Sequence, residues 1–153
     1  MTTDATGDWL KALRGALIAD SQLAAAVGLD ENDGVKVYVW PPANLPFPFV
    51  TIGNISFGDW STSDTAGQEF RQDIEVWDSK PTGAHGESSS SAKARAIAAR
   101  VYAICHREDL KYVPFAVPGR NLALVQAIGG RLQLEPDGIT NRAVVTLRIL
   151  IGN

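Results

Sequence analysis

The stretch from Gln68 to Asp78 alternates with a period of two residues, and this pattern restricts the fold more than any other feature of the sequence. One row of its side chains is largely apolar, whereas the other is charged and ends on an indole: Phe70, Gln72, Ile74 and Val76 against Arg71, Asp73, Glu75 and Trp77. Such alternation is typical of a strand with one face on a core. The sequence therefore predicts a half-buried strand, which needs neighbouring strands to form a sheet.

Two further strands are predicted before this one. The run from Val35 to Trp40 is rich in β-branched and aromatic residues, and it ends at two prolines that cannot continue a hydrogen-bonded ladder. A proline-containing strap then leads into a second strand from Phe49 to Phe57. The loop formers between Gly58 and Gly67 predict a long hairpin connection to the alternating strand.

The last third of the chain predicts two strands, Leu122 to Glu135 and Thr140 to Ile151. Between them stands Pro136-Asp137-Gly138, whose residues favour the backbone angles of a turn. Gly129 and Gly130 interrupt the first of these strands, and glycines inside a strand indicate a bulge or a bend. A hairpin with one irregular strand is therefore expected.

Helices are predicted at two places. Between Asp8 and Gly28 apolar residues recur every three or four positions, with Asp8 placed to cap the helix, a break expected near Asp20, and Gly28 placed to end it. The second helix begins after four serines at positions 88–91, which can cap it, and runs to about Glu108. One side of this helix is apolar, and its basic residues lie mostly off that side.

These elements occur in the order helix, strand, strand, strand, helix, strand, strand. Hairpin-type connections favour an α+β fold, in which a mainly antiparallel sheet carries about two helices packed on one face. The 153 residues, 45% of them hydrophobic, are expected to form a single domain over residues 1–153. A chain of this length buries enough surface to need no disulfide or structural metal.

Charge is segregated along the chain, although the formal net charge is only −3. Residues 1–78 carry twelve acidic and four basic side chains, whereas residues 79–153 carry five acidic and ten basic ones. Two interpretations stay open. Either the halves interleave and neutralise each other within one molecule, or opposite poles favour head-to-tail contacts that close into rings. An isoelectric point near 5.3 argues against a surface built for general nucleic-acid affinity.

No constellation of residues predicts a catalytic site, a cofactor or a metal. Cys105 and His106 are adjacent, but consecutive helical side chains point about 100° apart and cannot meet, so Cys105 is expected to be a small buried hydrophobe. The glycine-rich loops that bind nucleotides and the turn that presents a nucleophilic serine both lack their required spacing.

Two acidic segments have structural explanations. The segment from Asp30 to Gly34 resembles a calcium loop only faintly, because its glycine comes one place early, and it is expected to be a turn. Asp73 and Glu75 share a strand face with Arg71 and are expected to form a cross-strand salt-bridge row rather than an acid/base pair.

The four tryptophans carry more information about function. Trp9 and Trp40 are expected in the core or at its edge. Trp60 lies in a polar loop and Trp77 on the charged face of its strand, where aromatic rings often anchor contacts between subunits. The alternative for Trp60 is a loop that folds back over its own sheet.

Five segments follow one another in a characteristic order. They are LRGALIAD, VYVWPPANLPFPFVTIG, DWSTSDTAGQEFRQDIEVWDS, AKARAIAARVYAICH and LEPDGITNRAVVTLRILI. From about Trp9 to Ile151 the chain resembles the family of tail completion proteins, or tail terminators, of long-tailed phages and of phage-derived gene transfer agents. The order and spacing of the segments, rather than any catalytic motif, carry this resemblance.

The resemblance implies a structural protein that closes the head-proximal end of a tail tube, stops tube polymerisation and offers a docking surface to the head. It implies a homo-oligomeric ring, expected to be a hexamer, that contacts the tail tube protein and a head-tail connector or stopper. DNA would only pass through the lumen. The residues expected at these contacts come from one loop and two strands: Asp59, Trp60, Ser61 and Thr62, then Trp77, with Arg142 and Arg148 as ion-pair partners.

The start of the chain, Met1 to Gly7, lacks the pattern of a secretion signal, and no apolar run approaches the roughly 18 residues of a membrane span. The expected location is the bacterial cytoplasm during assembly and then the particle. Two alternatives stay open, namely another neck component such as a connector or stopper, and a small nucleic-acid-binding domain. The second would use the basic side of the later helix: Lys93, Arg95, Arg100 and Arg107.

Overall fold

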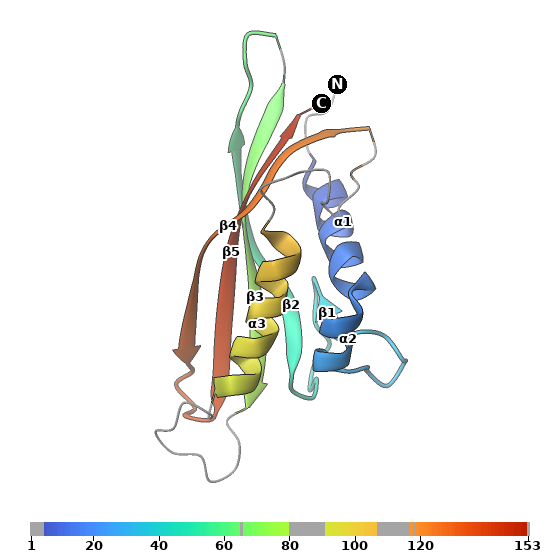
Figure 1. Cartoon of the computed structure of the whole chain (residues 1–153), viewed down its shortest axis with the longest axis vertical. Coiled ribbons are helices and arrows are strands. Elements are labelled where there is room, and N and C mark those ends of the chain that lie inside the picture. Colours follow the sequence, from blue (N-terminus) through green and yellow to red (C-terminus); the bar gives the residue numbers. More distant parts are fainter. Residues whose placement is uncertain (1–4, 65, 80–90, 107–116, 118, 153) are drawn as a thin grey trace.

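The computed structural model describes residues 5–64, 66–79, 91–106, 117 and 119–152. These residues form one five-stranded sheet with helices packed on one of its faces (Figure 1). The helices are α1 (Thr6–Ala19), α2 (Ser21–Val27) and α3 (Ala92–Cys105). The strands are β1 (Val37–Tyr38), β2 (Phe49–Asp59), β3 (Gly67–Ser79), β4 (Asn121–Leu134) and β5 (Thr140–Gly152).

The strands lie in the order β1-β2-β3-β5-β4. Every neighbouring pair is antiparallel except β1 and β2, which are parallel. The prediction of an α+β fold with a mainly antiparallel sheet is confirmed, but the sheet is mixed because of β1. Only two residues of the predicted strand from Val35 to Trp40 pair with β2, because the chain turns away after Tyr38 into the proline-rich strap.

The predicted break at Asp20 is confirmed, and it separates two helices rather than kinking one. Asp20 caps α2, because its carboxylate accepts a hydrogen bond from the backbone N–H of Leu23 at 2.8 Å. Gly28 ends α2 with a φ of 78°, a left-handed angle that glycine adopts without strain. The described residues therefore contain three helices where two were predicted.

The predicted cap of α1 at Asp8 is wrong. Ala5 occupies the N-cap position, and its backbone N–H donates to Oε1 of Gln68 on β3 at 2.8 Å, which ties the helix start to the sheet. Asp8 lies inside the first turn, where its negative charge still favours the helix dipole.

The predicted serine cap of α3 is also not formed at Ser91. Its side chain makes no capping hydrogen bond, and its hydroxyl instead accepts one from Nε of Arg95 at 3.1 Å. The helix ends at Cys105, three residues before the predicted end. The other serines, at positions 88–90, lie outside the described residues.

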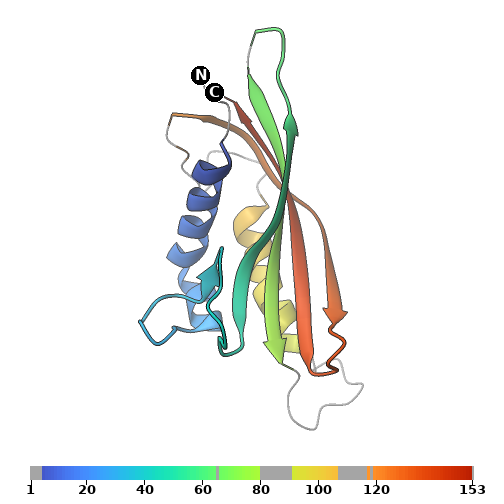
Figure 2. The same cartoon turned by 180° about the vertical axis from the view of Figure 1, so that it is seen from behind.

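The apolar row of β3 faces the helices, and the predicted half-buried strand is confirmed. Its members are fully buried and stand opposite the apolar row of β5: Phe70, Gln72, Ile74 and Val76 against Ile149, Leu147, Val145 and Ala143. Trp9 on α1 and Cys105 on α3 are also fully buried, as predicted. The opposite face of the sheet carries no helix among the described residues (Figure 2).

Gln72 is a fully buried polar side chain beside this core. Nε2 of Gln72 donates to the carbonyl oxygens of Gly53 and Asn54 at 3.0 and 3.2 Å, where the register of β2 shifts between Ile52 and Ile55. A bulge leaves carbonyl groups without strand partners, and buried carbonyls need donors. Gln72 supplies them from the neighbouring strand.

Acidic side chains of the first half of the chain pair with basic side chains of the second half. The fold brings the halves together because β3 lies beside β5 and α2 contacts α3. This arrangement favours the interpretation in which the charges neutralise each other within one molecule. The pairs are Asp8 with Arg120, Asp20 with Arg100, Glu69 with Arg148, and Glu75 with Arg142.

Candidate assembly interface

The face of the sheet without helices, called the open face below, carries a polar ladder across β3 and β5. Nε of Arg148 donates to Oε1 of Glu69 at 3.0 Å, and the hydroxyl of Thr146 donates to Oδ1 of Asp73 at 2.8 Å. The hydrogen bond from Arg148 holds the pKa of Glu69 below its ordinary value. Of the expected salt-bridge row, Glu75 pairs across the strands with Arg142 at 3.8 Å, whereas Asp73 bonds to a hydroxyl rather than to a cation, and Arg71 pairs with Glu69.

Trp77 lies at one end of this ladder within an aromatic cluster. Its ring stacks on Phe49 at a centroid distance of 6.2 Å, and Cζ of Arg142 lies 5.3 Å from its centroid. Its Nε1 donates to the hydroxyl of Thr51 at 3.0 Å. Trp77 is thus held by its own sheet and is partly exposed.

Arg142 and Arg148, predicted as ion-pair partners for a contact, both lie on the open face and both have partners within the chain. Nε of Arg142 is 3.0 Å from Oε1 of Glu135, an ion pair in which the N–H does not point at the carboxylate. A second acid, Glu75, lies 3.8 Å from the same guanidinium. Arg148 is paired more completely, because it donates from Nε and Nη2 to the two carboxylate oxygens of Glu69.

The predicted contact loop lies at the tip of the β2–β3 hairpin, which extends past the helices (Figure 1). Oδ1 of Asp59 accepts hydrogen bonds from the backbone N–H and the hydroxyl of Ser61 at 3.3 and 2.6 Å. Oγ of Ser61 accepts one from the N–H of Gly67 at 3.2 Å, and Oγ1 of Thr62 accepts one from Asp64 at 3.4 Å. These local bonds shape an exposed loop.

Trp60 folds back over this hairpin, as the alternative for this residue predicted. Its backbone N–H donates to the carbonyl of Gly67 at 2.9 Å. The ring lies so close that a Cβ at position 67 would be 2.9 Å from Cε3 of Trp60, which explains glycine there. Trp60 stays 39% exposed, so part of the indole is open to a partner.

The expected contact residues therefore fall into two groups rather than one site. The loop from Asp59 to Thr62 lies toward the same end of β3 as Glu69 and Arg148, because Asp59 is in register with Gln68. Trp77 and Arg142 are in register with each other near the opposite end of β3.

The expectation for Trp40 is wrong. This side chain is 92% exposed rather than in the core or at its edge. It follows β1, after the point where the chain leaves the sheet, so its neighbours in sequence do not share a buried face with it. It borders an open hollow of about 590 Å³ on the open face, together with Thr51, Glu75 and Trp77.

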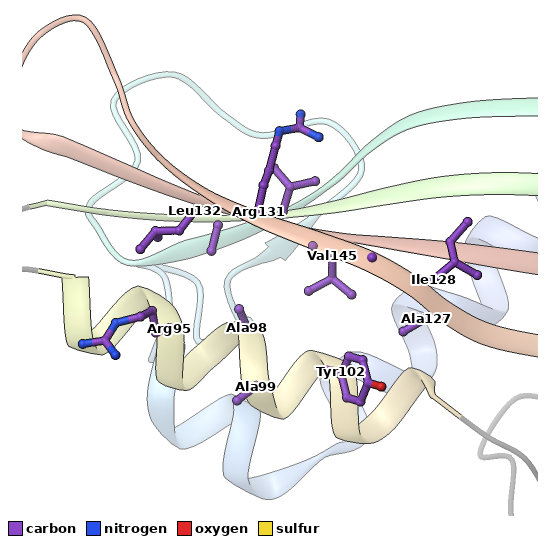
Figure 3. Close-up of a pocket in the computed structure, with 13 residues that line it drawn as sticks. Arg95, Ala98, Ala99, Tyr102, Ala127, Ile128, Arg131, Leu132 and Val145 are labelled. Carbon is purple, nitrogen blue, oxygen red and sulfur yellow. The ribbon is translucent and has the colours of Figure 1, made fainter. Parts of the chain in front are cut away.

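A groove of about 560 Å³ lies between α3 and the edge strand β4 (Figure 3). Its lining is mostly apolar and comes from both elements: Ala98, Ala99 and Tyr102 from the helix, and Ala127, Ile128 and Leu132 from the strand. Tyr102, Ile128 and Leu132 are 45%, 41% and 46% exposed. Clustered exposed apolar side chains mark contact sites for other proteins.

This groove could not be predicted from the sequence, because its two walls are distant in the chain. One signal for it did exist in the predicted bulge at Gly129 and Gly130, which the register shift between Ala127 and Gly129 confirms. The N–H of Ala127 donates to Nδ1 of His106, whose ring stacks on Tyr102 at 4.9 Å. The bulge thereby ties the irregular strand to the end of α3.

The family model of tail completion protein gp17 matches residues 11–152. The chain belongs to this tail completion family. The tail completion protein gp17 of Bacillus phage SPP1 is 26% identical over 113 residues, which are 74% of this chain and 74% of that protein. A chain in the virion of the native gene transfer agent (GTA) particle has the same fold, with a TM-score of 0.78 at 22% identity, covering 99% of this chain and all of that one.

Tail completion proteins are structural rather than enzymatic. Asp30 accepts hydrogen bonds from Asn32, Gly34 and the hydroxyl of Tyr38, so its segment is the predicted turn. Burial, together with the bond to Asp30, raises the pKa of Tyr38 to about 12. Within the described ranges no group of three or more His, Cys, Asp or Glu side chains could hold a metal ion.

The basic side of α3 is partly used inside this tail completion protein. Arg100 donates from Nε to Asp20 at 2.8 Å, and Arg95 donates to Ser91. Lys93 is exposed, and Arg107 lies outside the described residues.

Among the parts of the chain that the structure describes, no helix has the length and apolar character to cross a membrane.

Proposed function

We propose that this tail completion protein forms a hexameric ring that caps the head-proximal end of a tail tube. The ring ends tube polymerisation and provides the surface to which the head docks. Membership of the family over residues 11–152 carries this proposal. The fold match to a chain of a GTA particle supports a place inside such an assembly.

The two edges of the sheet support a ring. A closed ring of identical subunits needs two different, complementary surfaces on each subunit. At one edge stands the two-residue β1 with its proline-rich strap, and at the other stands the 14-residue β4 beside an apolar groove. These edges are unlike each other, as a head-to-tail contact requires.

The partners in this proposal are further copies of the chain, the tail tube protein and a head-tail connector or stopper. DNA passes through the lumen without tight binding, because several Lys or Arg contacts to phosphate would hold the genome back. Assembly takes place in the bacterial cytoplasm, and the protein then stays at the head-proximal end of the tail in the particle.

The native mass of the purified protein tests the ring. Six copies of the 16.4 kDa chain give about 98 kDa, and negative-stain images of that species should show a central hole. A monomer that forms the ring only on added tail tubes would still support the proposal. A monomer that binds no tubes contradicts it, and binding to isolated heads but not to tubes would favour a connector or stopper.

Replacing Trp60 with Ala is expected to weaken assembly on tail tubes at least tenfold while the monomer stays folded. The indole covers only its own hairpin tip, yet its exposed part is an aromatic surface of the kind that anchors contacts. Co-sedimentation of the variant with tail tubes measures the binding, and circular dichroism checks the fold.

Ile139→Ala is the matched control for Trp60, because Ile139 is also exposed but lies in the turn between β4 and β5. It should bind tubes as the wild type does. Equal tube binding by the Trp60 variant and the wild type would remove this loop from the interface.

A further inference from the structure

Trp40 is the most exposed of the large apolar side chains in the described residues, at 92%. Burying an indole on a partner removes a large apolar surface from water, which makes Trp a frequent anchor of interfaces. Pro41 and Pro42 follow it directly and restrict the backbone. A side chain presented on a restricted strap loses less conformational freedom when it binds.

A matching hollow exists at the opposite edge of the sheet. The groove between α3 and β4 has a volume of about 560 Å³, enough for one indole ring. Ala98 and Val145 face each other across it, with Tyr102 toward one end and Arg95 toward the other (Figure 3). Small side chains along its floor leave the space that a large ring would fill.

The backbone of β4 favours contact through side chains over addition of another strand. Two register shifts interrupt its pairing with β5, between Leu122 and Leu124 and between Ala127 and Gly129. Bulges twist an edge strand and prevent a regular ladder from extending across it. A partner at this edge therefore binds the groove rather than the strand backbone.

The two edges also carry opposite charges. Arg95, which is exposed, borders the groove from the helix, whereas Arg131 belongs to the same edge strand and its side chain points to the open face (Figure 3). Glu31 and Asp33, also exposed, lie in the turn that precedes β1. Opposite charges on two surfaces favour their encounter and fix their orientation.

We propose that Trp40 of one copy inserts into the groove between α3 and β4 of the next copy. The inference rests on the proposed ring, because only a second copy can bring the β1 edge to the β4 edge. Since the two surfaces lie at opposite edges of one sheet, the same contact repeats from copy to copy until the ring closes.

Replacing Trp40 with Ala tests the inserted side chain. The self-association constant should weaken about thirtyfold or more, as for a central anchor of an interface. The monomer should keep its circular dichroism spectrum and Tm, because the side chain is 92% exposed. Ile139→Ala, again the control, should associate as the wild type does.

Cross-linking tests the pairing of the two surfaces while Trp40 stays in place. Pro41→Cys and Ala99→Cys are made in separate chains, mixed, and treated with a short bismaleimide, so that only links between molecules form a heterodimer. Cys105 is fully buried and should not react. The mixture of Pro41→Cys with Ile139→Cys is the control and should give no such product.

The outcomes separate the two proposals. A Trp40→Ala variant that associates like the wild type, or equal cross-linking in both mixtures, overturns this contact and leaves the ring in place. A wild-type protein that never associates, either alone or on tail tubes, overturns both the contact and the ring.

Discussion

Replacing Gln72 with Glu is expected to lower the free energy of unfolding by about 3 kcal/mol or more at neutral pH. The side chain is fully buried, and its Nε2 donates to the carbonyls of Gly53, Asn54 and Asp73. A carboxylate in the same place would lose these bonds and face carbonyl oxygens instead. Urea denaturation of the variant and the wild type measures the difference.

The loss should depend on pH in a defined direction. Burial beside carbonyl oxygens would raise the folded-state pKa of the new Glu above its unfolded value of about 4.3. The variant should therefore be least destabilised below that value, where both states are protonated, and increasingly destabilised as the pH rises through the raised pKa.

Gln126→Glu is the control for this charge, because Gln126 lies on the open face in register with Arg148. Its effect should stay within about 0.5 kcal/mol at neutral pH. If the Gln72 variant were as stable as this control, Gln72 would not be the donor that the bulge in β2 requires.

Replacing Asp20 with Ala is expected to lower the free energy of unfolding by about 2–3 kcal/mol. One carboxylate caps α2 through the N–H of Leu23 and also accepts two hydrogen bonds from Arg100 on α3. The substitution removes the cap and the link between two helices at once. Thermal and urea unfolding of the purified variant measure the loss.

The pH dependence of this loss follows from the same contacts. The hydrogen bond from Arg100 holds the pKa of Asp20 below its ordinary value of 3.8. Its contribution is therefore complete above that value and disappears as the pH falls through the lowered pKa, so the wild type and the variant should converge in strong acid.

Asp8→Ala makes the same substitution in the neighbouring helix, where the carboxylate is mostly exposed and pairs with Arg120. Its effect should stay below about 1 kcal/mol. Equal losses for both variants would mean that the two links of Asp20 add nothing beyond an ordinary surface ion pair.

The candidate interface could be predicted only in part. The polar loop and the charged strand face are visible in the sequence, and the structure places Trp60 and Trp77 there. Their partners are not visible, because Arg142 and Arg148 meet Glu135 and Glu69 only when strands pair. The groove beside β4 joins residues that sequence spacing does not connect.

The exposure of Trp40 also depends on tertiary structure rather than on neighbouring residues. A run of β-branched and aromatic residues predicts a strand, and a strand places its large apolar side chains in a core. The number of residues that pair with β2 depends instead on where the chain leaves the sheet. It leaves directly after Tyr38. The indole consequently stands in solvent, where it becomes the anchor proposed above.

The sequence by itself determined the features that depend on neighbouring residues. These are the alternation of β3, the break at Asp20, the β4–β5 hairpin and the bulge in β4, because backbone angles and side-chain direction follow local geometry. Only the tertiary structure decided the parallel pairing of β1, the link between Asp20 and Arg100, the exposure of Trp40 and the groove at the opposite edge. Each of these features depends on which distant segments come into contact in the folded chain. Local periodicity carries no information about which distant segments pack together.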